Sequence, residues 1–189
     1  MDRIIAKELL SIGAVFLRPE EPFTWASGIK SPIYCDNRLT LSAPSTRDKV
    51  EHGLAELVKT YYPECQMLMG TSTAGIAHAA ITATILGLPM GYVRGESKSH
   101  GRNNRIEGRI STGGSAIDVV EALREAGAEV LGIVSIFTYG IKKGLDRIAA
   151  AHTENHSLSN LDTLVDVAIE EGYIEPKWKD MIIQFRNSL

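Results

Sequence analysis

Apolar residues recur at helical spacing in two segments of the first third of the chain. Residues 2–12 are predicted to form a helix that ends at Gly13, and its apolar side carries Ile4, Ile5, Leu9 and Ile12. A longer helix is predicted over residues 44–62, capped by Ser42 or Ser45, with an apolar side of Val50, Leu54, Leu57, Val58 and Tyr61. The intervening residues 22–41 are rich in proline, glycine and aromatic residues, which favours strands and turns.

From residue 66 onward, short apolar runs alternate with amphipathic segments. The predicted elements are a strand at 66–69, a loop at 70–75, a helix at 76–86 closed by Gly87, a strand at 90–93, a helix at 113–126 capped by Thr112, a strand at 130–137, and helices near 144–151, 160–171 and 176–187. The run at 130–137 is almost continuously apolar, as expected for a strand buried on both faces. This alternation predicts an α/β fold with a parallel sheet flanked by helices.

The predicted helix that starts near residue 113 has no strand before it. In doubly wound α/β folds, ligand-binding loops lead from the carboxyl end of a strand into a helix. The preceding residues 108–111 (Gly-Arg-Ile-Ser) are too few and too polar to form a central strand. A strand that the architecture requires is therefore absent from this sequence.

Composition narrows the class of protein. The chain has 189 residues, of which 44% are hydrophobic and 23% charged, which fits one globular domain and excludes wholesale disorder. A net charge of −3 argues against a constitutive nucleic-acid partner. Two cysteines exclude a disulfide framework and a cysteine-based zinc site, and the histidines lack metal-site spacing.

No apolar run approaches the roughly 20 residues needed to span a bilayer, so we expect a cytoplasmic protein without a membrane partner.

Two loops rich in glycine and hydroxyl groups precede predicted helices. Free backbone N–H groups and the helix dipole make such loops suitable for phosphate, although an ordinary helix cap or turn has the same composition. Between them, residues 94–109 carry five Lys or Arg residues against two Glu, a local charge of +3. A glycine-bearing cationic segment of this kind suits a polyphosphate ligand, while a solvated surface loop is the alternative.

Taken together, these segments resemble the orotate phosphoribosyltransferase family of type I phosphoribosyltransferases. The matching stretches are residues 23–34 (FTWASGIKSPIY), 70–75 (GTSTAG), 92–94 with 98–101, 104–108, 111–115 (STGGS), 121–127 (EALREAG) and 136–139 (IFTY). The resemblance implies one phosphoribosyltransferase-like domain over residues 1–189. Residues 1–41 would form an N-terminal helix and a small hood, and residues 42–189 an α/β core with C-terminal helices.

The resemblance also implies a reaction and its residues. Phosphoribosyl pyrophosphate, carrying Mg²⁺, and orotate would give orotidine 5′-monophosphate and pyrophosphate, through a transition state with oxocarbenium character, in pyrimidine biosynthesis. The implied pyrophosphate clamp is Arg94, Lys98 and His100, on a mobile loop that reaches the neighbouring subunit's site in a homodimer. The 5′-phosphate would be held by Ser111, Thr112, Gly113, Gly114 and Ser115, and Ser111 would also touch orotate. The pyrophosphate would be bordered by Thr71, Ser72, Thr73, Ala74 and Gly75, and the orotate ring covered by Phe23, Ser27 and Tyr34. No residue of the chain is assigned as a metal ligand.

The sequence departs from the family pattern at several places. Some family members have a lysine at the position of Ala26 and an arginine at that of Thr138, both meeting orotate. In the family, the strand absent here normally ends in two acids that contact the ribose hydroxyls. The missing segment, including the strand and both acids, is roughly a dozen residues long, which suits one strand of typical length and its flanks. Either the chain truly lacks this strand, or the natural protein carries a further internal piece. The alternative functions are a non-catalytic phosphoribosyltransferase-fold protein that binds nucleotides or regulates a partner, and a Rossmann-like protein of other function.

Overall fold

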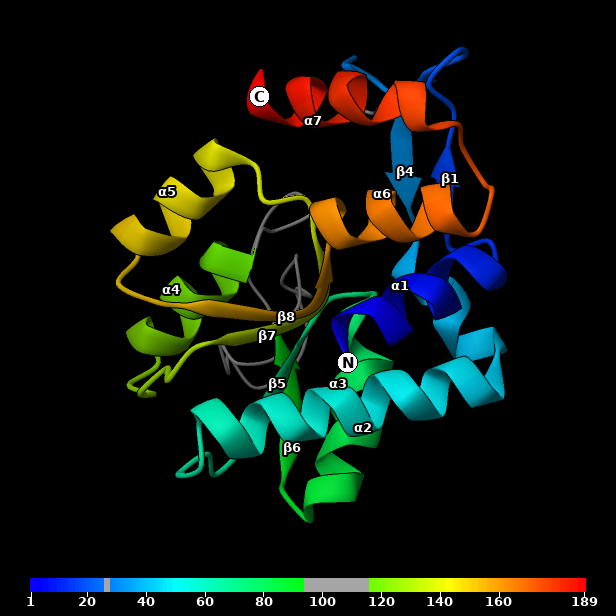
Figure 1. Ribbon diagram of the computed structural model, residues 1–189. Helices are drawn as coiled ribbons and strands as arrows, with labels where there is room; N and C mark the ends of the chain where they lie inside the picture. The colour runs from blue at the N-terminus through cyan, green and yellow to red at the C-terminus, as the bar shows by residue number, and fades with distance from the viewer. Residues whose placement is uncertain (26–27, 94–115) are drawn as a thin grey trace. The chain divides into compact units, whose positions relative to one another are not determined.

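The computed structural model describes residues 1–25, 28–93 and 116–189 (Figure 1). Contacts within the chain gather in two compact units. The first unit contains residues 1–50, 135–145 and 157–189, and the second contains residues 51–134 and 146–156. The division into a hood of residues 1–41 and a core of residues 42–189, within one domain, stays a prediction.

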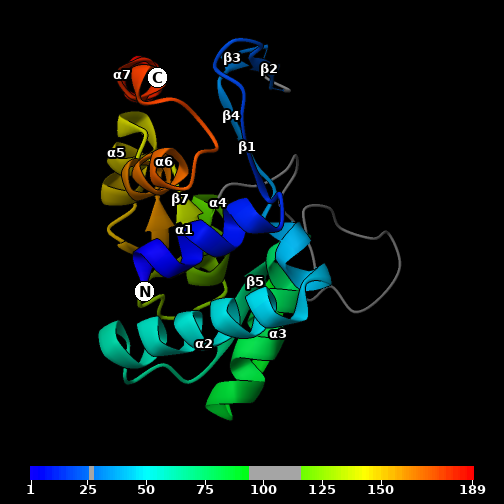
Figure 2. The ribbon, with the colours of Figure 1, turned by 45° about the vertical axis from the view of Figure 1, so that its right-hand side comes forward.

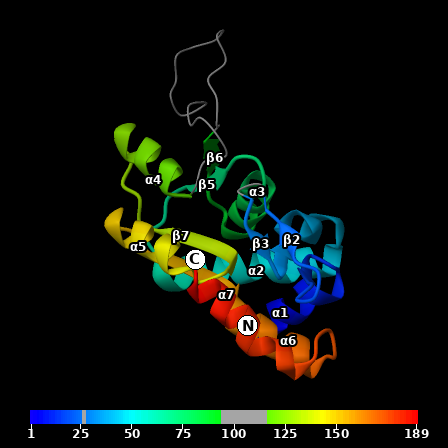
Figure 3. The same ribbon diagram turned by 90° about the horizontal axis from the view of Figure 1, so that it is seen from above.

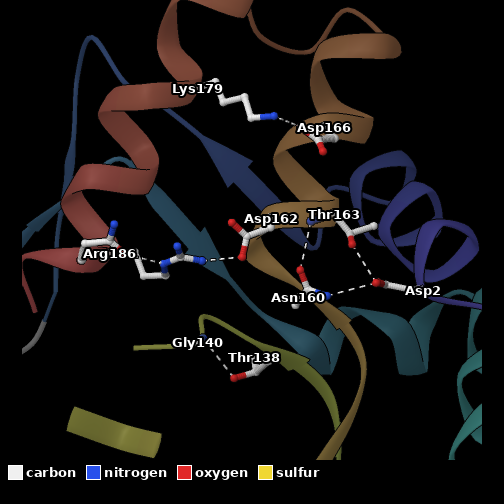
Figure 4. A network of polar contacts seen from close by, with 10 residues as sticks. Asp2, Thr138, Gly140, Asn160, Asp162, Thr163, Asp166, Lys179 and Arg186 are labelled. Atoms are coloured by element: carbon white, nitrogen blue, oxygen red, sulfur yellow. Dashed lines mark hydrogen bonds and ion pairs between the residues drawn. The ribbon is translucent and has the colours of Figure 1, made fainter. Parts of the chain in front are cut away.

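In the first unit, helix α1 (Asp2–Ser11) packs against helix α6 (Leu161–Glu170). The predicted helix is confirmed, but its buried residues are Ile5, Ala6, Leu9 and Leu10, while Ile4 is 51% exposed. Two hydrogen bonds join the two helix starts, and a third caps α6 (Figure 4). Asp2 Oδ2 accepts from Asn160 Nδ2 at 3.0 Å and from Thr163 Oγ1 at 2.7 Å, while Asn160 Oδ1 caps α6 by accepting from the Thr163 N–H at 3.0 Å. These contacts hold the start of α1 against the start of α6.

Four short strands follow α1 and form two antiparallel pairs (Figure 2). Strand β1 (Val15–Leu17) pairs with β4 (Ile33–Cys35), and β2 (Phe23–Thr24) pairs with β3 (Lys30–Ser31). A 3-10 helix, η1 (Asn37–Ser42), leads from β4 to helix α2 (Pro44–Tyr61), which runs from the first unit into the second. The predicted strands and turns of residues 22–41 and the predicted long helix are confirmed, whereas β1 was not predicted.

The second unit contains a parallel strand–helix–strand motif (Figure 3). Strand β5 (Leu68–Thr71) pairs in parallel with β6 (Met90–Val93), with Gly70 opposite Tyr92. Helix α3 (Gly75–Leu86) connects the strands and packs against both. It ends at Gly87, whose φ of +67° is the left-handed conformation that glycine adopts readily. This motif confirms the predicted α/β class with a parallel sheet flanked by helices.

A further two-stranded sheet pairs β7 (Ile133–Thr138) with β8 (Asn155–Asn160), and helix α5 (Lys142–Ala150) connects them. Helix α4 (Ala116–Glu125) precedes β7. Strand β8 was missed because its sequence, Asn-His-Ser-Leu-Ser-Asn, lacks an apolar pattern. The Ser135 and Ser157 hydroxyls share a hydrogen bond of 2.6 Å between the two strands. Of the β7 residues only Ile136 is buried, contrary to the prediction of a strand buried on both faces, since within the described residues β7 pairs only with β8.

The chain ends in a short 3-10 helix, η3 (Pro176–Trp178), followed by helix α7 (Lys179–Asn187). The sequence predicted one helix over this range, but the turn that begins at Pro176 is tighter than an α-helix. Two ion pairs connect α7 to α6: Lys179 with Asp166 at 2.5 Å, and Arg186 with Asp162 (Figure 4). None of the described helices is long and apolar enough to cross a membrane.

Candidate functional site

The loop between β5 and α3 lies at the carboxyl end of a parallel strand, the edge of the sheet where α/β folds bind ligands. The strand ends at Thr71 and the helix begins at Gly75, so only Ser72, Thr73 and Ala74 connect them. The Ser72 hydroxyl donates to the Val93 carbonyl at the end of β6, and the Ser72–Thr73 peptide bond is cis. Thr73 and Ala74 are exposed. The first N–H groups of α3 therefore lie beside an exposed, hydroxyl-bearing turn, which suits an anion.

Gly70 makes this tight turn possible. A Cβ atom at Gly70 would lie 2.9 Å from the Gly75 carbonyl oxygen and 2.9 Å from the Ile76 Cα. Both neighbours are backbone atoms, so they cannot rotate away as a side chain would. The absence of a side chain at Gly70 lets the end of β5 pass close to the first turn of α3.

We expect Gly70→Ala to destabilise the protein by about 1–3 kcal/mol, because the new methyl group must push the start of α3 away from β5. The same shift should weaken the binding of inorganic pyrophosphate measured by titration calorimetry. Urea unfolding reports the stability change. The matched control is Gly144→Ala in α5, where the added Cβ meets nothing within 4 Å, so neither quantity should fall. Unchanged pyrophosphate binding in Gly70→Ala would contradict the assignment of this loop to an anion.

Three aromatic rings come together on the short strands of the first unit. The Phe23 ring centroid lies 5.9 Å from that of Tyr34 and 6.4 Å from that of Phe16, and the Arg18 guanidinium lies 5.0 Å from the Phe23 centroid. Tyr34 is 40% exposed. The structure thus brings together two of the three residues expected to cover a flat ring, while the third, Ser27, lies outside the described residues.

A second aromatic cluster forms directly after β7. The Tyr139 ring contacts the rings of Phe137 and Trp25, with centroid distances of 5.2 and 5.7 Å, and Trp25 also contacts Phe185 of α7 at 6.0 Å. The Tyr139 hydroxyl accepts a hydrogen bond of 3.1 Å from the Cys35 backbone N–H. Sequence reasoning gave Tyr139 no role, although an aromatic residue just after an apolar strand was a usable signal.

The Cys35 thiol in this cluster is suited to packing rather than to nucleophilic chemistry. Burial, together with the Asp36 carboxylate, raises the pKa of the Cys35 thiol to about 12. Its Sγ donates to Asn37 Oδ1 at 3.2 Å. A thiol with so high a pKa carries almost no thiolate at neutral pH, and the thiolate is the reactive form.

A buried polar network lies behind the β5–α3 loop. Glu51 of α2 is fully buried, and its Oε1 lies 2.6 Å from His78 Nδ1. The other oxygen, Oε2, accepts from the Thr82 hydroxyl at 2.8 Å. Both partners belong to α3, one helical turn apart, so the carboxyl group joins this helix to α2. The histidine spacing considered for metals did not reveal this network, but a histidine and a threonine at i and i+4 on an otherwise apolar helix were a signal for it.

The remaining expected site residues fall outside the described part of the chain. These are the clamp residues Arg94, Lys98 and His100 and the phosphate loop Ser111, Thr112, Gly113, Gly114 and Ser115. Within the described ranges, no group of three or more His, Cys, Asp or Glu side chains is placed to hold a metal ion.

The chain has relatives of known function among curated proteins, although no family model matches it. It is 55% identical to the orotate phosphoribosyltransferase of Bacillus cytotoxicus over 187 residues, covering 92% of this chain and 89% of that protein. A Bacillus cereus orotate phosphoribosyltransferase is 54% identical over the same length.

Solved structures support the same fold. The orotate phosphoribosyltransferase of Aeropyrum pernix superimposes with a TM-score of 0.68 at 24% identity, covering 89% of this chain and 99% of that one. The UMP synthase of Leishmania donovani gives a TM-score of 0.79 at 22% identity, and this chain spans 42% of its length. At these identities the likeness concerns the fold.

The alignment with the Bacillus cytotoxicus protein contains more positions than this chain fills. The covered 92% of 189 residues is about 174 residues, whereas the alignment runs over 187, which leaves about 13 positions without a residue of this chain. That number agrees with the segment of roughly a dozen residues expected before Ser111 from the missing strand and its flanks.

Proposed function

The chain belongs to the orotate phosphoribosyltransferase family, and we propose on this basis that it transfers the phosphoribosyl group of phosphoribosyl pyrophosphate to orotate. The products are orotidine 5′-monophosphate and pyrophosphate. The observation that carries the proposal is 55% identity to a Bacillus orotate phosphoribosyltransferase over 92% of the chain. The parallel β5–α3–β6 motif with its anion-suited loop supports it.

In this reaction the bond from the ribose C1′ to the pyrophosphate oxygen breaks and a bond from C1′ to the orotate ring nitrogen forms. Negative charge develops on the departing pyrophosphate, so donors aimed at it lower the barrier. Thr71, Ser72, Thr73, Ala74 and Gly75 border the pyrophosphate, a role that the free N–H groups at the start of α3 support. Arg94, Lys98 and His100 clamp the same group.

The other substrate groups are assigned by the family resemblance. The loop of Ser111, Thr112, Gly113, Gly114 and Ser115 holds the 5′-phosphate, and Ser111 also meets orotate. Phe23, Ser27 and Tyr34 cover the orotate ring, and the contact between the Phe23 and Tyr34 rings supports their joint role. Mg²⁺ would be carried by the oxygen atoms of phosphoribosyl pyrophosphate, which suit this hard cation, and it would supply partial neutralisation of the diphosphate charge.

The natural protein carries an internal segment before Ser111 that contains the missing strand and its two acids. The 13 or so unfilled alignment positions support this. Without the strand, several buried apolar side chains would be lost, each contributing about 1.5–3 kcal/mol, and neighbouring strands would have open edges. A protein of 20.6 kDa without this segment should fold poorly or rebuild the sheet from residues 105–111.

Orotate consumption, followed with and without phosphoribosyl pyrophosphate on a sample of known intact mass, tests both proposals. We expect consumption that depends on phosphoribosyl pyrophosphate, from a protein heavier than 20.6 kDa by about a dozen residues. A folded protein of the larger mass that leaves orotate unchanged would favour the non-catalytic alternative, a nucleotide-binding or regulatory protein. An active, cooperatively folding protein of 20.6 kDa would overturn the internal segment.

The protein is a homodimer in which the clamp residues of one subunit serve the other subunit's site. Mixing an Arg94→Ala chain with a Gly113→Asp chain should therefore restore activity that neither has alone. Random assortment makes half of the C2 dimers hybrids with one intact site, so recovery should reach roughly a quarter of wild-type activity. Hybrid dimers that form, as shown by differently tagged chains, yet stay inactive would contradict the shared site.

We also propose a cytoplasmic location. The chain has only two cysteines, which suits a reducing compartment.

A further inference from the structure

The Tyr139 side chain joins two parts of the first unit that lie far apart in the sequence. Its hydroxyl accepts the backbone N–H of Cys35, a residue 104 positions earlier, at 3.1 Å. Cys35 is the last residue of β4 and pairs with Val15 of β1, and the next N–H, that of Asp36, donates to the Ala14 carbonyl at 2.8 Å. The Tyr139 hydroxyl therefore holds the end of the β1–β4 pair at one defined point.

The ring of Tyr139 holds a second segment. Trp25 directly follows β2, and its ring centroid lies 5.7 Å from that of Tyr139. The Trp25 ring also contacts Phe185 of α7, at a centroid distance of 6.0 Å. The Trp25 indole Nε1 donates to the Ile33 carbonyl of β4 at 3.4 Å. The Tyr139 hydroxyl thus holds Cys35, which follows Tyr34, and the Tyr139 ring holds Trp25, which lies two residues after Phe23.

Tyr139 lies at the carboxyl end of strand β7, the end of a strand near which α/β folds bind their ligands. It is the first residue after β7, and residues that follow the carboxyl ends of strands line the ligand crevice in such folds. Burial, reinforced by Cys35, raises the pKa of the Tyr139 hydroxyl above its usual range. The hydroxyl is therefore neutral near pH 7 and accepts the Cys35 N–H without adding charge.

We propose that Tyr139 is a positioning residue that holds β4 and the Trp25 segment against the carboxyl end of β7, so that Phe23 and Tyr34 are kept in place for the pyrimidine ring. This inference rests on the proposed function, because it assigns the two rings to orotate. Tyr139 acts through the backbone of Cys35 and the ring of Trp25. It serves binding of the base and is not needed for binding of phosphoribosyl pyrophosphate.

Tyr139→Phe tests the inference, because it removes the hydroxyl and leaves the ring packing. We expect the KM for orotate to rise about three- to tenfold, the change that follows from losing one hydrogen bond, while the KM for phosphoribosyl pyrophosphate changes less than about twofold. Tyr139→Leu, which also removes the ring, should raise the KM for orotate further. Both values are measured below the unfolding temperature of every variant. Tyr173→Phe, at an exposed tyrosine of the same unit, is the control and should leave both values unchanged.

The outcomes separate this inference from the proposed function. An unchanged KM for orotate in Tyr139→Phe, or an equal rise in both KM values, overturns the positioning role, since an equal rise indicates a general loss of structure. In either case the wild type still consumes orotate, so the proposed function stands. A wild type that consumes no orotate overturns both.

Discussion

Replacing Lys98 by alanine should lower kcat by about 10²–10³-fold, the loss typical of removing one donor to a developing negative charge. In the proposed clamp the Lys98 side chain meets pyrophosphate as its charge grows, so its contribution should be larger in the transition state than in the ground state. The KM for orotate should therefore change little, because the proposed role of Lys98 is toward pyrophosphate and not toward the base. Steady-state kinetics with each substrate varied in turn measure the two parameters.

A matched control comes from helix α2. Lys59 is exposed and pairs with Glu56 at 2.8 Å, so Lys59→Ala removes the same charge from the surface and should leave kcat unchanged. Equal turnover in Lys98→Ala and the wild type would remove Lys98 from the mechanism. Equal losses in Lys98→Ala and Lys59→Ala would indicate that overall charge, rather than the clamp, attracts the anionic substrate.

The Glu51→Ala substitution should lower the free energy of unfolding by about 3–5 kcal/mol, because it leaves buried polar partners unsatisfied and opens a cavity. The affected groups are His78 Nδ1 and the Thr82 hydroxyl, both on α3. Since α3 begins at the loop that we propose borders the pyrophosphate, binding of phosphoribosyl pyrophosphate should weaken as well. Urea unfolding measures the first effect and titration calorimetry the second.

Glu56→Ala, on the same helix but at an exposed carboxylate, should change stability by less than about 0.5 kcal/mol. Glu51→Gln keeps an oxygen for His78 and should fall between the wild type and Glu51→Ala. A Glu51→Ala protein as stable as the Glu56→Ala control would show that the buried network contributes nothing to the packing of α3 on α2.

Elements with a local signal were predicted from the sequence. The apolar spacing of Val50, Leu54 and Val58 predicted α2, and these three residues are buried. Strand β6 was predicted over Met90–Val93 as observed, and Gly87 was identified as the end of α3. The loop Thr71–Gly75 was recognised from its glycine and hydroxyl residues. In each case the residues that predict the element lie close to one another in the sequence.

Elements that depend on distant partners were missed or only partly predicted. Strand β8 has a polar sequence and exists through its pairing with β7. Ile4 belongs to the apolar stripe of α1, yet in the folded chain, where α1 packs against α6, Ile5 and Leu9 are buried and Ile4 is exposed. The apolar run of β7 indicated burial on both faces, a condition that needs neighbouring strands as well as suitable side chains.

The sequence by itself determined the fold class, the helices with regular apolar spacing, the anion-suited loop after β5 and the family, because order and spacing of short motifs are properties of the chain alone. The tertiary structure decided that Glu51 meets His78 and Thr82, and that the Tyr139 hydroxyl meets the Cys35 N–H. These contacts join residues 27 to 104 positions apart. Periodicity describes only one element at a time, whereas a buried carboxyl or hydroxyl group finds its partner through the packing of several elements.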